Sequence, residues 1–85
     1  MAQTTTKHTV TNASWTAVAT AKTKVLVTSN DILPFFVHVA GSAPAIDAPG
    51  FECSRGEPFS AADLDADSNV YVRAKGAPVD VIVIA

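Results

Sequence analysis

Residues 70–74 and 79–85 read Val-Tyr-Val-Arg-Ala and Val-Asp-Val-Ile-Val-Ile-Ala, and these two stretches decide the fold class of the chain. In the first stretch, valines alternate with a tyrosine and an arginine, which is the period of a β-strand with one face inward and one outward. The second stretch is dense in β-branched residues, which favour strands. Residues 75–78, Lys-Gly-Ala-Pro, lie between the two and predict a hairpin connection.

The second of these strands is apolar on both faces. After Asp80, Val81 and Val83 lie on one face, and Ile82 and Ile84 lie on the other. A strand with one solvated face alternates apolar and polar residues, so both faces of this strand are expected to be covered. The opposite sheet covers one of them. The other is covered either by another subunit or by a long loop of the same chain.

The rest of the chain also divides into short apolar stretches separated by Gly, Pro, Asn and Asp. Strands are predicted near residues 8–11, 15–18, 23–28, 35–40 and 51–54. Residues 59–64 are the only stretch that tolerates a helical turn, and it is too short to matter. About six to eight short strands at roughly 8–12-residue spacing predict an all-β fold, a small antiparallel β-sandwich or barrel-like (jelly-roll-like) domain. Residues 13–85 are assigned to this single domain. Residues 1–12, rich in threonine, are expected to form an extended N-terminal arm.

Composition points to a surface that other proteins cover. Charged residues make up 16% of the 85 residues and hydrophobic residues 48%, whereas typical soluble domains carry about 25% charge. A domain of this size has a thin core and often gains stability by oligomerisation. Cys53 is the only cysteine, which excludes an internal disulfide and fits synthesis in a reducing cytosol.

Several partners and activities are not expected. The six lysines and arginines are scattered, which argues against nucleic acid and against an anionic membrane surface. The apolar runs are too short for a membrane span, and the first residues show no signal peptide. There is no glycine-rich phosphate loop and no nucleophile elbow. We therefore predict that the chain is not an enzyme and binds no cofactor, and keep a small β-fold enzyme or enzyme inhibitor as a remote alternative.

Two groups of residues are of the types that could bind a metal ion. Residues 63–69, Asp-Leu-Asp-Ala-Asp-Ser-Asn, place oxygen ligands at alternate positions, as calcium loops do. An EF-hand needs a glycine and a glutamate where this chain has Ser68 and Ala74, so a solvated acidic turn is the simpler interpretation. His8, His38 and Cys53 lack the spacing of a zinc site. No metal is predicted.

The segment Asn69–Gly76, followed by a valine-rich terminal strand, carries a resemblance to a known group of proteins. An opening strand at Trp15, the stretch 25–30 (Val-Leu-Val-Thr-Ser-Asn), an aromatic strand and a Pro/Gly loop precede it. In this order the chain resembles small β-sandwich virion proteins of tailed bacteriophages, including head decoration (cement) proteins and spike or tail accessory proteins. The resemblance implies a trimer or dimer on the outer virion surface, bound at junctions between capsid subunits, without catalytic residues.

The expected function is therefore that of a capsid decoration protein, which binds a bacteriophage head and stabilises it through oligomeric contacts. Its expected partners are the major capsid protein and itself, as a homotrimer or a dimer, and its location is the virion after synthesis in the host cytoplasm. The alternative is a tail or spike-tip accessory protein that binds host surface glycans. The residues expected to make contacts are Thr9, Val10, Trp15, Phe36, His38, Tyr71, Arg73, Ile82 and Ile84.

Overall fold

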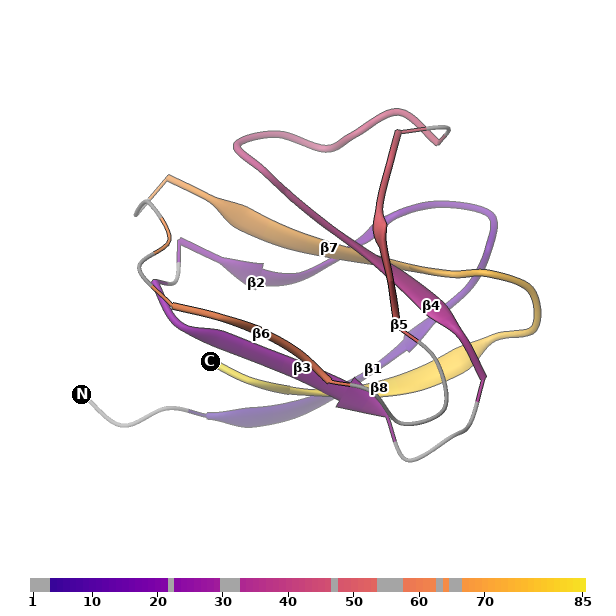
Figure 1. The fold of residues 1–85 in the computed structure, drawn as a ribbon, viewed down its shortest axis with the longest axis horizontal. Coiled ribbons are helices and arrows are strands. Elements are labelled where there is room, and N and C mark those ends of the chain that lie inside the picture. The colour runs from indigo at the N-terminus through magenta and orange to yellow at the C-terminus, as the bar shows by residue number, and fades with distance from the viewer. Residues whose placement is uncertain are drawn as a thin grey trace.

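The computed structural model describes residues 4–21, 23–29, 33–46, 48–53, 58–62, 64 and 67–85. These residues form eight strands and no helix, arranged as two antiparallel four-stranded sheets (Figure 1). The strands are β1 (Thr5–Val10), β2 (Thr16–Thr20), β3 (Val25–Ser29), β4 (Phe35–Ala40), β5 (Phe51–Cys53), β6 (Phe59–Ala61), β7 (Asn69–Ala74) and β8 (Val79–Ile84). The predicted all-β sandwich is confirmed.

The strand order shows that the chain is a jelly roll. The first sheet has the order β1-β8-β3-β6, and the second has the order β2-β7-β4-β5. Strand β1 pairs with β8, β2 with β7, β3 with β6 and β4 with β5, all antiparallel. These nested pairs describe one long hairpin that has rolled up, so that β8 also meets β3 and β7 also meets β4. Eight strands rolled in this way into two sheets form the double-sheet jelly roll.

The core lies between the two sheets and consists mainly of valines. Every second residue of β8, Val79, Val81 and Val83, is at most 1% exposed. Phe35 and Val37 of β4, in the second sheet, belong to the same core cluster and are 1% and 3% exposed. Branched side chains suit this position because they pack well on a pleated surface. The core is therefore thin and almost entirely aliphatic.

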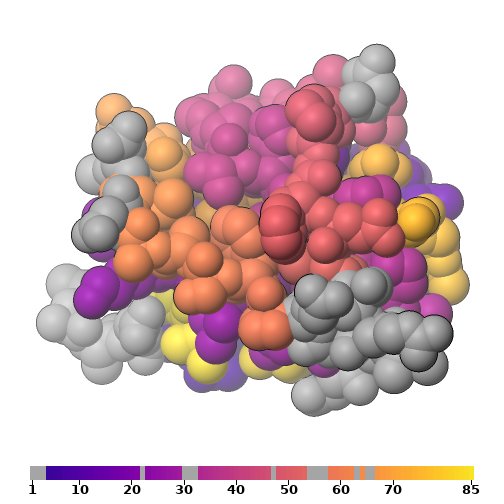
Figure 2. All heavy atoms as spheres, in the orientation of Figure 1, coloured from indigo at the N-terminus to yellow at the C-terminus, as the bar shows by residue number. Residues whose placement is uncertain are grey.

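One side of the sandwich is closed by aromatic contact. Strands β5 and β6 lie nearest the viewer in Figure 1, and their atoms meet across the front of the molecule in Figure 2. The rings of Phe51 and Phe59 join them at a centroid distance of 6.1 Å. Strands β1 and β2 form the opposite, far side, where Thr4 and Ala85 exchange two backbone hydrogen bonds of 2.8 and 3.0 Å.

Three local expectations differ from the structure. Thr5–Val10 pairs along its whole length with β8, so this part of the expected arm is a strand of the sandwich. Residues 59–61 form β6 instead of a helical turn. Residues 75–78 connect the second sheet to the first and do not close a hairpin, because β7 and β8 belong to different sheets. In each case pairing with a distant strand overrides the local pattern.

Candidate interaction surfaces

The last strand presents two apolar faces, as its sequence predicted. Its valines point into the core, while Ile82 and Ile84 point outward from the first sheet and stay half-buried. Leu26 of β3 pairs with Ile84 of β8 and is also half-buried. We call Leu26, Ile82 and Ile84 the apolar outer face. A shallow hollow of about 450 Å³ lies beside Leu26 and Ile84 and is bounded by Lys24, Ser60 and Ala62.

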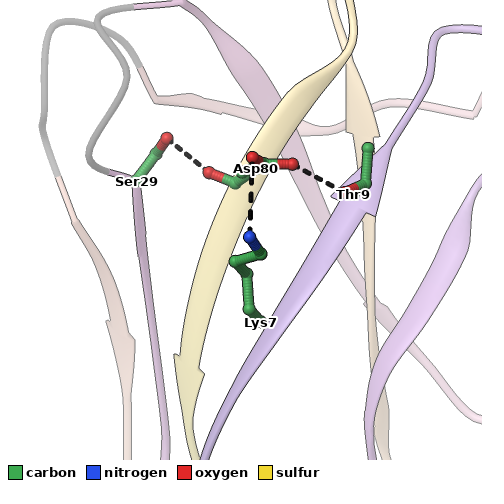
Figure 3. A network of polar contacts seen from close by, with 4 residues as sticks. All are labelled: Lys7, Thr9, Ser29 and Asp80. Atoms are coloured by element: carbon green, nitrogen blue, oxygen red, sulfur yellow. Dashed lines mark hydrogen bonds and ion pairs between the residues drawn. The ribbon is translucent and has the colours of Figure 1, made fainter.

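A network of polar contacts around Asp80 joins β1, β8 and β3 (Figure 3), and its Lys7 lies opposite Ile82 of the apolar outer face. Thr9 Oγ1 donates a 2.6 Å hydrogen bond to Asp80 Oδ1, and Lys7 Nζ lies 4.0 Å from Asp80 Oδ2. Ser29 Oγ donates a 2.7 Å bond to the backbone oxygen of Asp80. The Lys7 and Asp80 side chains are 64% and 49% exposed, and an ion pair this exposed adds little stability. Its importance is that it places one positive and one negative charge at the rim of an apolar surface.

The outer face of the second sheet carries a different group, which we call the tryptophan cluster: Trp15, Phe36, His38 and Arg73. The pairing of β4 with β7 sets Phe36 opposite Arg73. The Arg73 guanidinium lies 5.3 Å from the Trp15 ring centroid and 5.2 Å from that of Phe36, and Trp15 lies 5.5 Å from His38. The guanidinium is thus held between two aromatic faces, an arrangement that favours a cation.

The tryptophan cluster holds the loop of residues 41–50 against the sheet. Trp15 Nε1 donates a 2.9 Å hydrogen bond to the oxygen of Ala45. His38 Nδ1 lies 2.6 Å from the oxygen of Pro49. Gly50 packs so closely that a Cβ there would lie 2.8 Å from both Phe36 Cβ and Trp15 Cη2. The chain's own loop therefore covers much of this face, in contrast to the apolar outer face.

One atom of the tryptophan cluster has no hydrogen-bond partner in the described part of the chain, and a small hollow lies beside the cluster. The Nε of Arg73 is buried and has no hydrogen-bond partner among the described residues, while its Nη1 donates a 3.4 Å bond to Asn12 O. Beside Trp15, a hollow of about 230 Å³ is lined by Ser14, Pro44 and Ile46. Ile46 is 49% exposed. This hollow is small and has no charged side chain in its lining.

The nine residues expected to make contacts divide between these surfaces and the core. Thr9, Ile82 and Ile84 lie on the outer face of the first sheet, and Trp15, Phe36, His38, Tyr71 and Arg73 lie on that of the second. Tyr71 is only 6% exposed. Val10 is fully buried in the chain's own core, so its side chain is not available to a partner. It faces inward because it pairs with Val79 at the end of β1.

One member of the apolar outer face, Leu26, is not among the residues expected to make contacts. Leu26 occupies an outward position in a strand whose neighbours Val25 and Val27 are 2% and 0% exposed. The stretch Val-Leu-Val has no polar residue to mark its outer side. The signal was nevertheless the same as in β8, an apolar residue at the alternate position of a strand.

The ionisable and sulfur groups of the described residues form no cluster suited to a metal ion. No group of three or more His, Cys, Asp or Glu residues in this part of the chain is placed to hold one. Cys53 is fully buried, and His8 Nε2 lies 3.1 Å from Thr6 Oγ1. The acidic segment 63–69 falls partly outside the described residues. No helix among the described residues has the length and hydrophobicity to cross a membrane.

No family model matches the chain, and no curated protein or solved structure matches it either. A function for this chain is therefore inferred from its own residues and geometry.

Proposed function

We propose that this chain is a structural protein of a bacteriophage particle, a decoration protein that binds the outer surface of the head and stabilises it. The observation that carries the proposal is the apolar outer face. Ile82 and Ile84 stand outward on a central strand, beside Leu26, in a chain with only 16% charged residues. Contiguous apolar surface of this kind, bordered by polar residues, is typical of protein interaction sites.

The fold and the resemblance support the same proposal. Jelly rolls occur in viral capsid and lectin domains, and the strand Asn69–Ala74 is the segment that resembles phage virion proteins. A fold hosts many functions, so neither point suffices alone. They gain weight together with a surface suited to permanent contact with protein.

The mechanism is that of a staple. Each copy buries its apolar outer face on capsid protein and adds contacts between neighbouring capsid subunits. A single contact of this size is weak, but many copies arranged by the capsid symmetry act together. Separation of capsid subunits under internal pressure then requires many such contacts to break at once.

Binding to capsids assembled without this protein tests the proposal. Ile82→Thr removes apolar surface from the outer face, and Ile46→Thr is the matched control, the same change at an exposed isoleucine on the loop over the opposite sheet. We expect Ile82→Thr to weaken capsid binding at least about tenfold and Ile46→Thr to leave it unchanged. Equal binding by both variants contradicts the proposed surface.

The hollow beside Trp15 favours a second candidate, a tail or spike-tip protein that binds host surface glycans. Aromatic rings with nearby polar groups suit sugars. Against this use, Trp15 already contacts His38 and Arg73 and donates its Nε1 hydrogen to Ala45. Binding to a panel of host glycans that Ile46→Thr weakens, without any binding to capsids, would favour this second function.

A further inference from the structure

We propose that strand β1 of one copy pairs antiparallel with β1 of a second copy, which joins two first sheets into one continuous eight-stranded sheet. This inference deepens the proposed function by naming the surface through which copies associate. It rests on that function only for the requirement that copies lie side by side. Self-association is measured on the purified protein without capsids, so its failure and the failure of capsid binding are distinguishable.

Strand β1 is the least protected of the four sheet edges. Edge strands expose unpaired backbone groups, and proteins shield them with short strands, bulges, proline or charge. Among the described strands, β5 and β6 have three residues each, and β2 has an irregular register between Ala17 and Ala19. Strand β1 has six residues in regular register with β8. Its charged residue is Lys7.

The hydrogen-bond phase of β1 identifies the groups that face outward. Thr4 and Ala85 exchange both backbone hydrogen bonds. Because such pairs alternate in an antiparallel ladder, Thr6, His8 and Val10 bond to β8. The N–H and C=O groups of Thr5, Lys7 and Thr9 therefore point away from the sheet, and an antiparallel copy of the strand offers the matching donors and acceptors.

The side between β1 and β2 is open to such a partner. A hollow of about 280 Å³ lies there, lined by Thr4 and Ala85, by Thr6 of β1 and by residues 17–20 of β2. The two strands belong to different sheets and do not pair with each other. An added strand thus continues the first sheet without displacing a described segment.

Three registers, centred on Thr6, Lys7 or His8, bring the unpaired backbone groups of β1 opposite those of the second copy. The charge of Lys7 favours one of these registers. Centring the pair on Lys7 sets two ammonium groups opposite each other, which is unfavourable. Centring it on Thr6 sets Lys7 opposite Thr5 of the second copy, in the row of Ile84. Centring it on His8 sets Lys7 opposite Thr9 of the second copy, in the row of Asp80. In this last register each Lys7 meets the Asp80 row of the other copy.

The selected register has a consequence for the apolar outer face. The outward residues of β1 and β8 share one side of the sheet in both copies. The two sets of Leu26, Ile82 and Ile84 then lie on the same side of one sheet, with the two Lys7–Asp80 groups between them. A pair of copies presents twice the apolar surface of one copy to a capsid.

Disulfide trapping tests the register. His8 and His8 of the second copy form a non-hydrogen-bonded pair with Cα atoms about 4.5 Å apart, a separation that a disulfide spans. We expect His8→Cys to give a covalent dimer under mild oxidation. Thr6→Cys is the matched control on the same face of the strand. In this register, residue 6 of the second copy lies four residues further along the strand, so the two Thr6→Cys sulfurs are roughly 13 Å apart. Cys53 is buried, so the unmodified chain measures how much covalent dimer forms without an introduced cysteine.

A charge exchange gives a second readout that does not depend on cysteine. We expect Lys7→Asp and Asp80→Lys each to weaken self-association roughly tenfold, and the double exchange to restore it, by sedimentation at rising concentration. Circular dichroism identifies any variant that fails to fold. If a cysteine variant fails to fold, the charge variants test the proposal, and if a charge variant fails, the cysteine variants do. A His8→Cys protein that is folded but stays monomeric, equal trapping by Thr6→Cys, or no change on charge exchange overturns the proposal.

Discussion

The two faces of β8 predict losses of stability of unequal size for the same substitution. Val83 is 1% exposed, whereas Ile82 stands on the outer face and is half-buried. Replacing each with alanine removes two carbon atoms from Val83 and three from Ile82. A count of deleted atoms ranks Ile82→Ala as more damaging. The structure ranks Val83→Ala as more damaging, because only the inner site leaves a cavity.

The magnitudes follow from burial. Two carbons at about 0.8 kcal/mol each, plus a cavity between two sheets, give roughly 2–3 kcal/mol for Val83→Ala. Ile82 already exposes part of its side chain to water and has no enclosed space to vacate, so Ile82→Ala is expected to cost about 1 kcal/mol or less. In a domain of this length, Val83→Ala is expected to lower the melting temperature by roughly 10–20 °C, and Ile82→Ala by less than about 8 °C.

Urea unfolding measures both values directly. The protein is diluted until sedimentation shows a monomer, so that loss of subunit contacts does not enter the result. An unchanged slope of free energy against urea confirms that stability alone has changed. If Ile82→Ala costs as much as Val83→Ala in the monomer, the outer face is enclosed within one chain. The reasoning that assigns this face to a partner is then wrong.

Three further substitutions test the rest of the structure. Trp15→Phe keeps a ring but removes the hydrogen bond to Ala45. We expect the free energy of unfolding to fall by about 0.5–1.5 kcal/mol and proteolysis to become faster in the loop of residues 41–50. Unchanged cleavage would contradict the role given to this bond. Gly50→Ala should cost about 1–3 kcal/mol and change the fluorescence of Trp15, since the new Cβ has no room; an unchanged spectrum and stability would show that the loop packs differently. Ala21 has a φ of 56°, so Ala21→Gly should raise stability by about 0.5–1 kcal/mol in thermal melting, and a loss of stability would refute the left-handed conformation.

The positions of most strands could be predicted from sequence, but most of their pairing could not. Residues 35–40 were expected as a strand and form β4 with the same bounds. Alternation of apolar and polar residues reports which way a side chain points, and it carries no information on which strand lies alongside. The expected hairpin at residues 75–78 failed for this reason, because the partners of β7 and β8 lie up to about 80 residues away in the sequence.

The first half of β1 was missed for a different reason. The inward positions of β1 include Thr6 and His8, which are polar, so no apolar alternation marks the strand before Val10. Threonine does favour strands, but a polar threonine-rich stretch also suits an exposed arm. Pairing with β8 decides between the two, and that pairing is not visible in the local sequence.

The candidate surfaces were partly predictable. The outward direction of Phe36 and His38 followed from the period of the strand, and the structure brings them together with Trp15 and Arg73. The loop that covers them depends on two hydrogen bonds to backbone oxygens, for which the sequence has no signal. The apolar outer face was found at Ile82 and Ile84 because nothing polar interrupts the end of β8.

Imaging of capsids assembled without this protein, after incubation with the purified chain, tests the central claim most directly. The predicted result is added density at each equivalent site on the outer surface of the head, with the sheet β1-β8-β3-β6 turned toward the capsid and β1 beside a second copy. Bare capsids at saturating protein concentration would contradict the proposed function. Density that contacts the capsid through the loop of residues 41–50 would contradict the assigned surface.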